Sequence, residues 1–382
     1  MDQKESVFCR EVILMPSKIN FGFRPSPCLA GALLALALTQ AIQAKNPAPL
    51  NPPLQWSDTE SQEQSVTFEG NAPHESIGIS VQNPNVSAGV LQKYVANGAA
   101  VKPEKSANWA ALLTPDRHYY LEIDGPRGHP WVGHRLELDE QATRSANPTN
   151  VRWDKNNTLH TRVPDKTLAG ATYQIRPHIS LMDLFGTSWE NRWRKNPSLP
   201  PIEIVLGQLG RPPLVLEVRG SPNGTGLLWI ASGRVLSSGE LVVTPGAGFV
   251  VRFPNQPGLG SGIRGETRNF PCRTPLISGW NLLAYPFPKD LRLSQDWWKG
   301  DTSTTSSSNP QQSDQIVTFL GGETKEYGLW ASPSGPRWRL INRSTMNWEE
   351  PSEFLDVIPT GYAFYLFRQK PNLDHVFLPP LH

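Results

Sequence analysis

The stretch "IEIVLGQLGRPPLVLEV", Ile202 to Val218, contains two short apolar runs separated by glycine and proline residues. Short runs rich in valine, isoleucine and leucine and bounded by such turn residues are typical of β-strands. In many similar segments along the chain, apolar and polar residues alternate, which is typical of half-buried strands in antiparallel sheets. We therefore expect an all-β protein.

The strand pattern recurs from the region after residue 64 to the C-terminus. The other segments that show it are 76–82, 118–123, 133–138, 172–177, 226–231, 240–243, 248–253, 280–285, 315–319, 337–341 and 362–367. Two short helices are predicted, at 180–186, where Ser180 would cap the first turn with Asp183 three residues later, and at 291–298. The expected fold is two or more antiparallel β-sandwich or small-barrel modules with short helices.

The second half of the chain resembles part of the first. The series YQIRP, SLMDLFG, IEIVL, LLWIA and VTPGAGFVVRF is matched in order by NLLAYP, LRLSQDWW, DQIVTF, YGLWA and VIPTGYAFYLF. This alignment pairs Pro177 with Pro286, Ile204 with Ile316, and Phe249 with Phe364. We interpret the match as an internal duplication. The predicted domains are a signal peptide (1–44), a polar proline-rich linker (45–64), an N-terminal β module (65–171) and two repeated β modules (172–265 and 266–382).

The N-terminal region has the features of an export signal. Lys18 and Arg24 precede the apolar run "LAGALLALALTQAIQA", which ends at Ala44, a plausible cleavage position. The run is shorter than the about 20 apolar residues needed to span a bilayer. Residues 1–14 fit poorly ahead of such a signal, and Met15 is the better translation start. We expect export to the periplasm, the outer surface or the extracellular space, with no transmembrane segment after signal removal.

Charge and cysteine content exclude several classes of protein. The 382-residue chain has a formal net charge of +2 with both signs interspersed, so no basic patch indicates a nucleic-acid partner. Of the three cysteines, Cys9 and Cys28 lie in the predicted signal, so the mature chain retains Cys272 alone. An intramolecular disulfide and a thiolate zinc site are therefore not expected.

Four segments resemble an uncharacterised family of exported verrucomicrobial proteins. They are "RHYYLEIDGPRGHPWVGHRLEL", "LAGATYQIRPHISLMDLFG", "GWNLLAYPFP" and "PTGYAFYLFR", and their order and spacing match that family over most of residues 76–380. The mature N-terminal region and the charged segment 186–200 depart from the family pattern. The resemblance implies export and β-rich modules, and it provides no catalytic residue.

No catalytic or metal-binding motif is convincing. The glycine pattern from Gly260 to Gly265 is followed by prolines that forbid the helix a dinucleotide site needs, so no cofactor is predicted. Histidines cluster between 118 and 178, but without the acidic motif of a metalloprotease, and we interpret them as surface or turn residues; they are His118, His129, His134, His160 and His178. A hydrolase would need two facing carboxylates, for which the candidates are Glu349, Glu350, Glu353, Asp356, Asp296 and Asp301.

Tryptophan is the residue type with the most functional interest. The chain has 13 tryptophans, and exposed aromatic rings can stack on sugar rings. Trp229 and Trp280 lie in apolar strands and are expected in the core, whereas four tryptophans beside polar residues are the candidate ligand-binding set: Trp297, Trp298, Trp338 and Trp348. Adjacent helical residues lie about 100° apart, so Trp297 and Trp298 cannot both face one core.

These observations favour a non-catalytic structural or adhesive protein of the cell envelope or extracellular space. Two alternatives remain open. One is a carbohydrate-binding module that uses the exposed tryptophans, and the other is a secreted hydrolase. The expected partners are polysaccharide or other envelope proteins.

Overall fold

The computed structural model describes residues 63–68, 74–154, 164–196, 198–223, 226–237, 241–252, 261–293, 303–320, 323–349 and 357–379. By its internal contacts the chain divides into two units, Met1–Asn46 and Pro47–His382, and all described residues belong to the second. This unit is built from antiparallel sheets with a few short helices, which confirms the predicted all-β class. No helix among these residues is long and apolar enough to cross a membrane.

The first large sheet, here called sheet 1, has the strand order β14-β13-β12-β11-β16-β2. Its strands are β2 (His74–Gly78), β11 (Ile202–Gln208), β12 (Arg211–Gly220), β13 (Leu227–Ala231), β14 (Arg234–Leu236) and β16 (Gly248–Arg252). Helix α4 (Leu181–Lys195) packs its apolar side chains, among them Trp189, against this sheet in one buried cluster with Trp229 and Phe249. The predicted helix start is confirmed, because Ser180 and Asp183 form a capping box.

The second large sheet, sheet 2, has the order β19-β26-β21-β22-β23-β24. Its strands are β19 (Gly279–Ala284), β21 (Gln315–Leu320), β22 (Glu323–Ser332), β23 (Gly335–Asn342), β24 (Asn347–Trp348) and β26 (Ala363–Arg368). Its main core joins Ile316, Leu329 and Phe364 with side chains of the flanking segments. The segment 291–298, predicted as a helix, instead begins with the short strand β20 (Leu291–Arg292), and its residues 294–298 lie outside the described residues.

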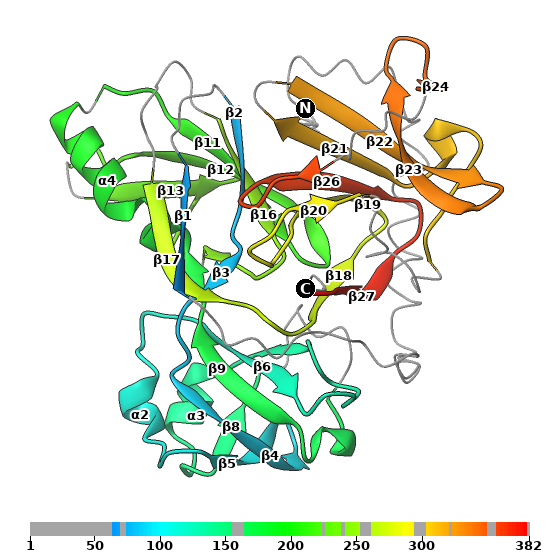
Figure 1. The fold of residues 1–382 in the computed structure, drawn as a ribbon. Coiled ribbons are helices and arrows are strands. Elements are labelled where there is room, and N and C mark those ends of the chain that lie inside the picture. Colours follow the sequence, from blue (N-terminus) through cyan, green and yellow to red (C-terminus); the bar gives the residue numbers. More distant parts are fainter. Residues whose placement is uncertain are drawn as a thin grey trace, which may run out of the picture. The chain divides into compact units, whose positions relative to one another are not determined.

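The third sheet is inserted in the chain between strands of sheet 1, and we call it the insert sheet (Figure 1, cyan to green). Its order is β7-β6-β9-β4-β5-β8, with β4 (Ser87–Val95), β5 (Gly98–Pro103), β6 (Tyr119–Gly125), β7 (Arg135–Glu137), β8 (Asn150–Arg152) and β9 (Thr172–Pro177). The helical turns α2 (Trp109–Leu112), α3 (Glu140–Arg144) and η1 (Lys166–Leu168) accompany it. One face carries its own apolar core, which includes the buried rings of Trp109, Trp131 and Trp153.

Short ladders accompany the large sheets. Strand β17 (Ser261–Thr267) pairs with β1 (Glu63–Phe68) and with β3 (Val81–Gln82). Strand β10 (Ile179–Ser180) pairs with β15 (Val242–Val243), β18 (Cys272–Leu276) with β27 (Asn372–Phe377), and β20 with β25 (Val357–Ile358). Residues 261–265 of the Gly260–Gly265 pattern lie in strand β17, and Gly260 lies outside the described residues.

Sheets 1 and 2 follow the same path of the chain. In each, the strand nearest the C-terminus, β16 or β26, lies between the first strand and the second. The registers also agree, because Ile204 faces Val251 in sheet 1 as Ile316 faces Leu366 in sheet 2. The common order supports the predicted duplication, which stays an interpretation.

The strand pairing corrects two parts of the predicted alignment. LLWIA, aligned by sequence with YGLWA, is β13, whereas YGLWA lies in β22, which occupies the place of β12. Segment 172–177, aligned by sequence with 280–285, is β9 in the middle of the insert sheet, where it pairs with β4 and β6. The strand that occupies the place of β19 in sheet 1 is β2. The predicted boundary between residues 171 and 172 therefore does not follow the sheets, because β1 to β3 pair with strands beyond the insert.

Sheets 1 and 2 contact each other through equivalent backbone atoms. The Gly78 N–H donates to the Gly361 carbonyl at 2.7 Å, and the Ala284 N–H donates to the Gly246 carbonyl at 3.0 Å. Gly78 and Ala284 end the equivalent strands β2 and β19. Such reciprocal contacts are typical of a two-fold arrangement. A small apolar cluster fills the contact and consists of Val205, Val250, Leu282, Ala363 and Tyr365.

Candidate functional site

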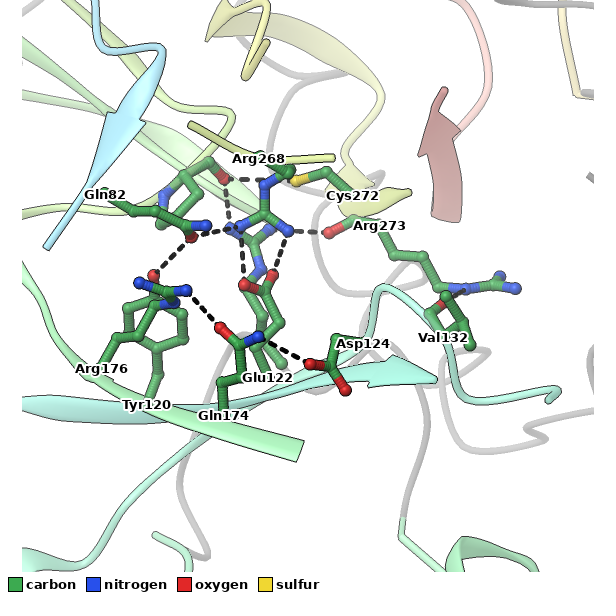
Figure 2. A network of polar contacts seen from close by, with 12 residues as sticks. Gln82, Tyr120, Glu122, Asp124, Val132, Gln174, Arg176, Arg268, Cys272 and Arg273 are labelled. Carbon is green, nitrogen blue, oxygen red and sulfur yellow. Dashed lines mark hydrogen bonds and ion pairs between the residues drawn. The ribbon is translucent and has the colours of Figure 1, made fainter. Parts of the chain in front are cut away.

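The buried polar cluster drawn in Figure 2 lies on the face of the insert sheet opposite its apolar core. Strand β6 contributes Tyr120, Glu122 and Asp124 from alternate positions, and β9 contributes Gln174 and Arg176 opposite them. Alternate residues of a strand share a face, so the sequences YLEID and QIR place their polar groups together. The cluster is buried because β3 and the segment after β17 pass over it.

Arg268 and Glu122 form the centre of this cluster (Figure 2). The two guanidinium nitrogens of Arg268 contact the two carboxylate oxygens of Glu122 at 2.5 and 2.8 Å, and their side chains are 2% and 0% exposed. Burial is the largest single influence and lowers the pKa of Arg268, but the attraction and hydrogen bonds of Glu122, together with Cys272 and Tyr120, outweigh it, so the pKa lies above its ordinary value. Gln82 Oε1 accepts hydrogen bonds from Arg268 at 3.1 Å and from the Tyr120 hydroxyl at 3.3 Å.

A second arginine connects the insert sheet to β17. Arg176 donates to the Asn83 carbonyl and to Glu266, both at 2.6 Å, and also to the side-chain oxygen of Gln174. Gln174 in turn donates to Asp124 at 2.7 Å. Burial raises the pKa of Asp124 despite its hydrogen bonds. Most donors and acceptors of this group are thus directed at one another, although Arg176 Nε has no hydrogen-bond partner among the described residues.

Two further arginines connect the insert sheet to the segments around β18 and β27. Arg135 donates to the carbonyls of Pro245 and Arg273, the latter at 2.7 Å. Arg273 donates to the Val132 carbonyl at 2.9 Å and to Asp374 at 2.6 Å. Buried charged groups therefore join the insert sheet to the ladder β1-β17-β3 and to the ladder β18-β27.

This buried cluster connects the insert sheet to β3, to β17 and to the segment that follows β17. Ionised groups lose hydration when buried, and they are tolerated where partners satisfy their hydrogen bonds. The cavity that touches it, between Gln82, Tyr120 and Pro245, has a volume of about 10 Å³. A space of about 10–15 Å³ holds a single water, so this cavity has no room for a substrate.

The clustered histidines that the structure describes do not contact a common group. His178 is buried and its Nε2 contacts both carboxylate oxygens of Glu137 at 2.8 and 2.9 Å. His134 is buried 3.7 Å from Asp374, and His118 lies 3.5 Å from Glu140. Burial lowers the pKa of His129. Within the described residues no group of three potential ligands converges on a metal position, and His160 lies outside them. The interpretation as surface or turn residues is wrong for His134 and His178, which are core residues.

A larger cavity, of about 180 Å³, lies where the insert sheet meets the start of α4. The polar residues that line it are Asp116, Arg117, His118, His178, Ser180 and Asp183. Arg117 contacts Asp183 at 2.8 Å, so the insert sheet and the helix are bridged at this point. The His178 N–H donates to the His118 carbonyl at 2.8 Å and thereby holds both histidines at the cavity.

The structure places two of the four candidate tryptophans. Trp338 is half-buried against the core of sheet 2, at the position that Trp229 occupies in sheet 1. Trp348 is half-buried too, and its indole N–H donates to the Ser308 carbonyl at 2.7 Å. Both residues are thus partly exposed, and their role in ligand binding stays a prediction. Trp297 and Trp298 lie outside the described residues, so their role stays a prediction.

The expected core tryptophans differ from each other. Trp229 is 1% exposed, as predicted, whereas Trp280 is half-buried and contacts Phe367 with ring centroids 5.0 Å apart. Of the candidate carboxylates, Glu349 is described and its carbonyl accepts a hydrogen bond from Arg339. The others, Glu350, Glu353, Asp356, Asp296 and Asp301, lie outside the described residues.

The buried ion pair was missed by the sequence interpretation because its partners are 146 positions apart. The available signal was the alternation in YLEID and YQIRP, which indicates a polar face but not what covers it. Cys272, the predicted single thiol of the mature chain, is a free buried cysteine.

Comparison with known proteins gives no relative: no protein-family model, no curated protein and no solved structure matches this chain.

Proposed function

We propose that the mature chain is an exported, non-catalytic protein that acts as a structural or adhesive component of the cell envelope or extracellular space. In this role its three large sheets act as a single structural block. The predicted signal sequence supports export, and the resemblance to exported β-rich proteins agrees with it. The described part of the chain supports the structural role through its contacts between sheets.

The observation that carries the proposal is the buried pair Arg268–Glu122. In an active site, charged groups must face the position of a substrate. Here two deeply buried opposite charges face each other and join separate parts of the fold. Removing one partner of such a pair is strongly destabilising, so the pair favours one fixed arrangement of the insert sheet.

The proposal is tested in the organism that encodes the chain. An antibody against the mature protein should detect it in the envelope fraction or the medium, with its N-terminus after the predicted signal. A deletion strain should lose envelope integrity or surface attachment, and the wild-type gene should restore it. Residence in the cytosol, or a deletion strain with unchanged envelope and attachment, would contradict the proposal.

The deletion strain can also be used to compare a buried arginine with an exposed one. A gene with Arg268→Met should restore the phenotype poorly, because the arrangement of the sheets is weakened. The matched control is Arg264→Met, which changes an exposed arginine on the neighbouring strand β17. This control should restore the phenotype as the wild type does.

A further inference from the structure

One face of sheet 1 carries exposed apolar side chains. Helix α4 packs on the opposite face, where Leu216 and Trp229 lie in the same buried cluster. Successive residues of a strand point to opposite faces, so the neighbours of these two residues point away from α4. Two of these neighbouring positions are apolar and exposed, Val235 at 63% and Val215 at 36%. We call this surface the β12–β14 patch, and its residues are Val215, Glu217, Arg219, Leu228, Ile230 and Val235.

The β12–β14 patch continues the apolar contact between sheets 1 and 2. Val205 and Val250 of sheet 1 lie in the small cluster that fills this contact. Val215 is the cross-strand neighbour of Val205 on the side away from Val250. From there the patch extends to Ile230 and Val235, which face each other across β13 and β14. The surface that sheet 1 already uses against sheet 2 therefore continues, partly exposed, to the last strand of sheet 1.

The equivalent face of sheet 2 indicates that the fold does not require apolar residues at these positions. The common strand order and register place Arg339 of sheet 2 at the position of Ile230, and Arg337 at the position of Leu228. Arg337 is exposed and Arg339 is half-buried. Exposed apolar patches rimmed by polar residues are typical of protein–protein contacts. The apolar residues of sheet 1 are therefore better explained by a contact with another protein surface than by folding.

The charges of the β12–β14 patch allow it to complement itself. Glu217 and Arg219 project from the same face of β12, with Arg219 Nε 3.7 Å from a Glu217 carboxylate oxygen, and their side chains are 48% and 51% exposed. A two-fold contact brings the same surface of two molecules together in opposite orientation. Glu217 of each copy can then face Arg219 of the other, while the valines contact each other. One acidic and one basic residue leave the patch without net charge, so a strongly charged partner is not favoured.

We propose that the β12–β14 patch is a self-association surface, through which two copies of the chain form a two-fold symmetric dimer. Interfaces of standard size use about 20–30 residues on each side, far more than this patch contains. The dimer is therefore expected to be weak and to form at high protein concentration, as between neighbouring molecules of an envelope component. The inference goes beyond the proposed function, because self-association is a property of the purified chain and does not depend on export.

Sedimentation velocity of the purified mature chain over a wide range of protein concentrations tests the proposal. The expected result is a monomer that converts reversibly into a dimer as the concentration rises. Val235→Arg should weaken dimerisation at least about tenfold, because the two-fold axis brings an unpaired charge into the contact from both copies. The matched control is Val90→Arg, which changes a valine that is 37% exposed on β4 of the insert sheet. This control should dimerise as the wild type does.

A charge exchange tests the orientation of the two copies. Glu217→Arg should weaken the dimer, because two arginines would then face each other across the contact. Adding Arg219→Glu to that variant should restore most of the association, because each pair again has opposite charges. Both side chains are exposed, so folding is expected to be unaffected, and circular dichroism verifies this. A double variant that associates no better than Glu217→Arg would overturn the two-fold arrangement.

A chain that remains monomeric at every concentration would overturn the proposal and assign the β12–β14 patch to a different partner. A dimer that Val235→Arg leaves intact, or that Val90→Arg disrupts equally, would also overturn it, because the contact would lie elsewhere. These outcomes are distinguishable from failure of the proposed function, since cell fractionation tests export independently of self-association.

Discussion

Gly248 of β16 packs against Ala363 of β26, and these residues begin the equivalent strands of sheets 1 and 2. A Cβ added to Gly248 would meet the Ala363 Cβ and would lie 2.6 Å from the Leu283 carbonyl oxygen. The close approach depends on a glycine at one of the two equivalent positions. The other position is Ala363, so the two residues are equivalent in position but differ by one methyl group.

Gly248→Ala should therefore loosen the contact between sheets 1 and 2. Overpacking of a tight contact costs about 1–3 kcal/mol, and we expect a loss of that size in the free energy of unfolding measured with urea. The control is Gly186→Ala in α4, where the added methyl meets the flexible end of Met182. That variant should be neutral or slightly stabilising, since alanine favours helices over glycine by about 1 kcal/mol. Equal stability of the two variants would contradict the tight contact.

The ion pair between Arg268 and Glu122 should show strong coupling. Loss of one partner of a buried pair costs about 3–5 kcal/mol, so Arg268→Met and Glu122→Gln are each expected to destabilise strongly. The double variant should lose clearly less than the sum of the two, because no unpaired charge remains. Urea unfolding of the four proteins measures this, with Arg264→Met as a control expected within about 0.5 kcal/mol of wild type. Additive losses would mean that the pair is not the connection described.

Alkaline pH should destabilise the protein through buried tyrosines. Burial raises the pKa of Tyr173 and of Tyr365 to about 12, from an ordinary value of about 10. A raised folded pKa contributes stability that is complete below the unfolded pKa and is lost as pH rises through the folded one. Stability should thus fall as pH rises from about 10 to about 12. Urea unfolding across this range measures the slope, which Tyr173→Phe should reduce; an unchanged slope would contradict the assignment.

Trp338 and Trp229 should contribute to stability at equivalent positions. Trp229→Ala is expected to cost about 3–5 kcal/mol, as for a core tryptophan, and Trp338→Ala somewhat less because its ring is half-buried. Retention on insoluble polysaccharide should be unchanged in Trp338→Ala after correction for the folded fraction. Loss of retention with unchanged stability would instead support Trp338 as a ligand-binding residue.

Local elements of the fold could be predicted from sequence because short-range patterns determine them. The capping residues Ser180 and Asp183 predicted the start of α4, although the helix runs on to Lys195. The alternating segments at 202–206 and 248–253 correspond to β11 and β16. Strand 172–177 was also recognised, but its partners were not, because pairing depends on contacts between distant parts of the chain.

The burial and contacts of the candidate site residues were harder to predict than the strands, because they depend on tertiary contacts. His178 stood out only as one of several clustered histidines, whereas its burial and its contact with Glu137 require the pairing of β6 with β7 and β9. Trp348 lies beside polar residues in sequence, yet its ring packs close to Gly328 because the two strands flank β23. Neighbours in sequence therefore did not indicate the contact that partly buries this ring.

The most direct test of a single structural block is hydrogen exchange of the mature chain in increasing urea, followed by mass spectrometry of its peptides. Peptides from β6 and β9 of the insert sheet, β11 of sheet 1 and β26 of sheet 2 should lose protection together, at one urea concentration. Early loss of protection in β6 and β9, while β11 and β26 remain protected, would contradict the block and the role of the Arg268–Glu122 pair in holding it together.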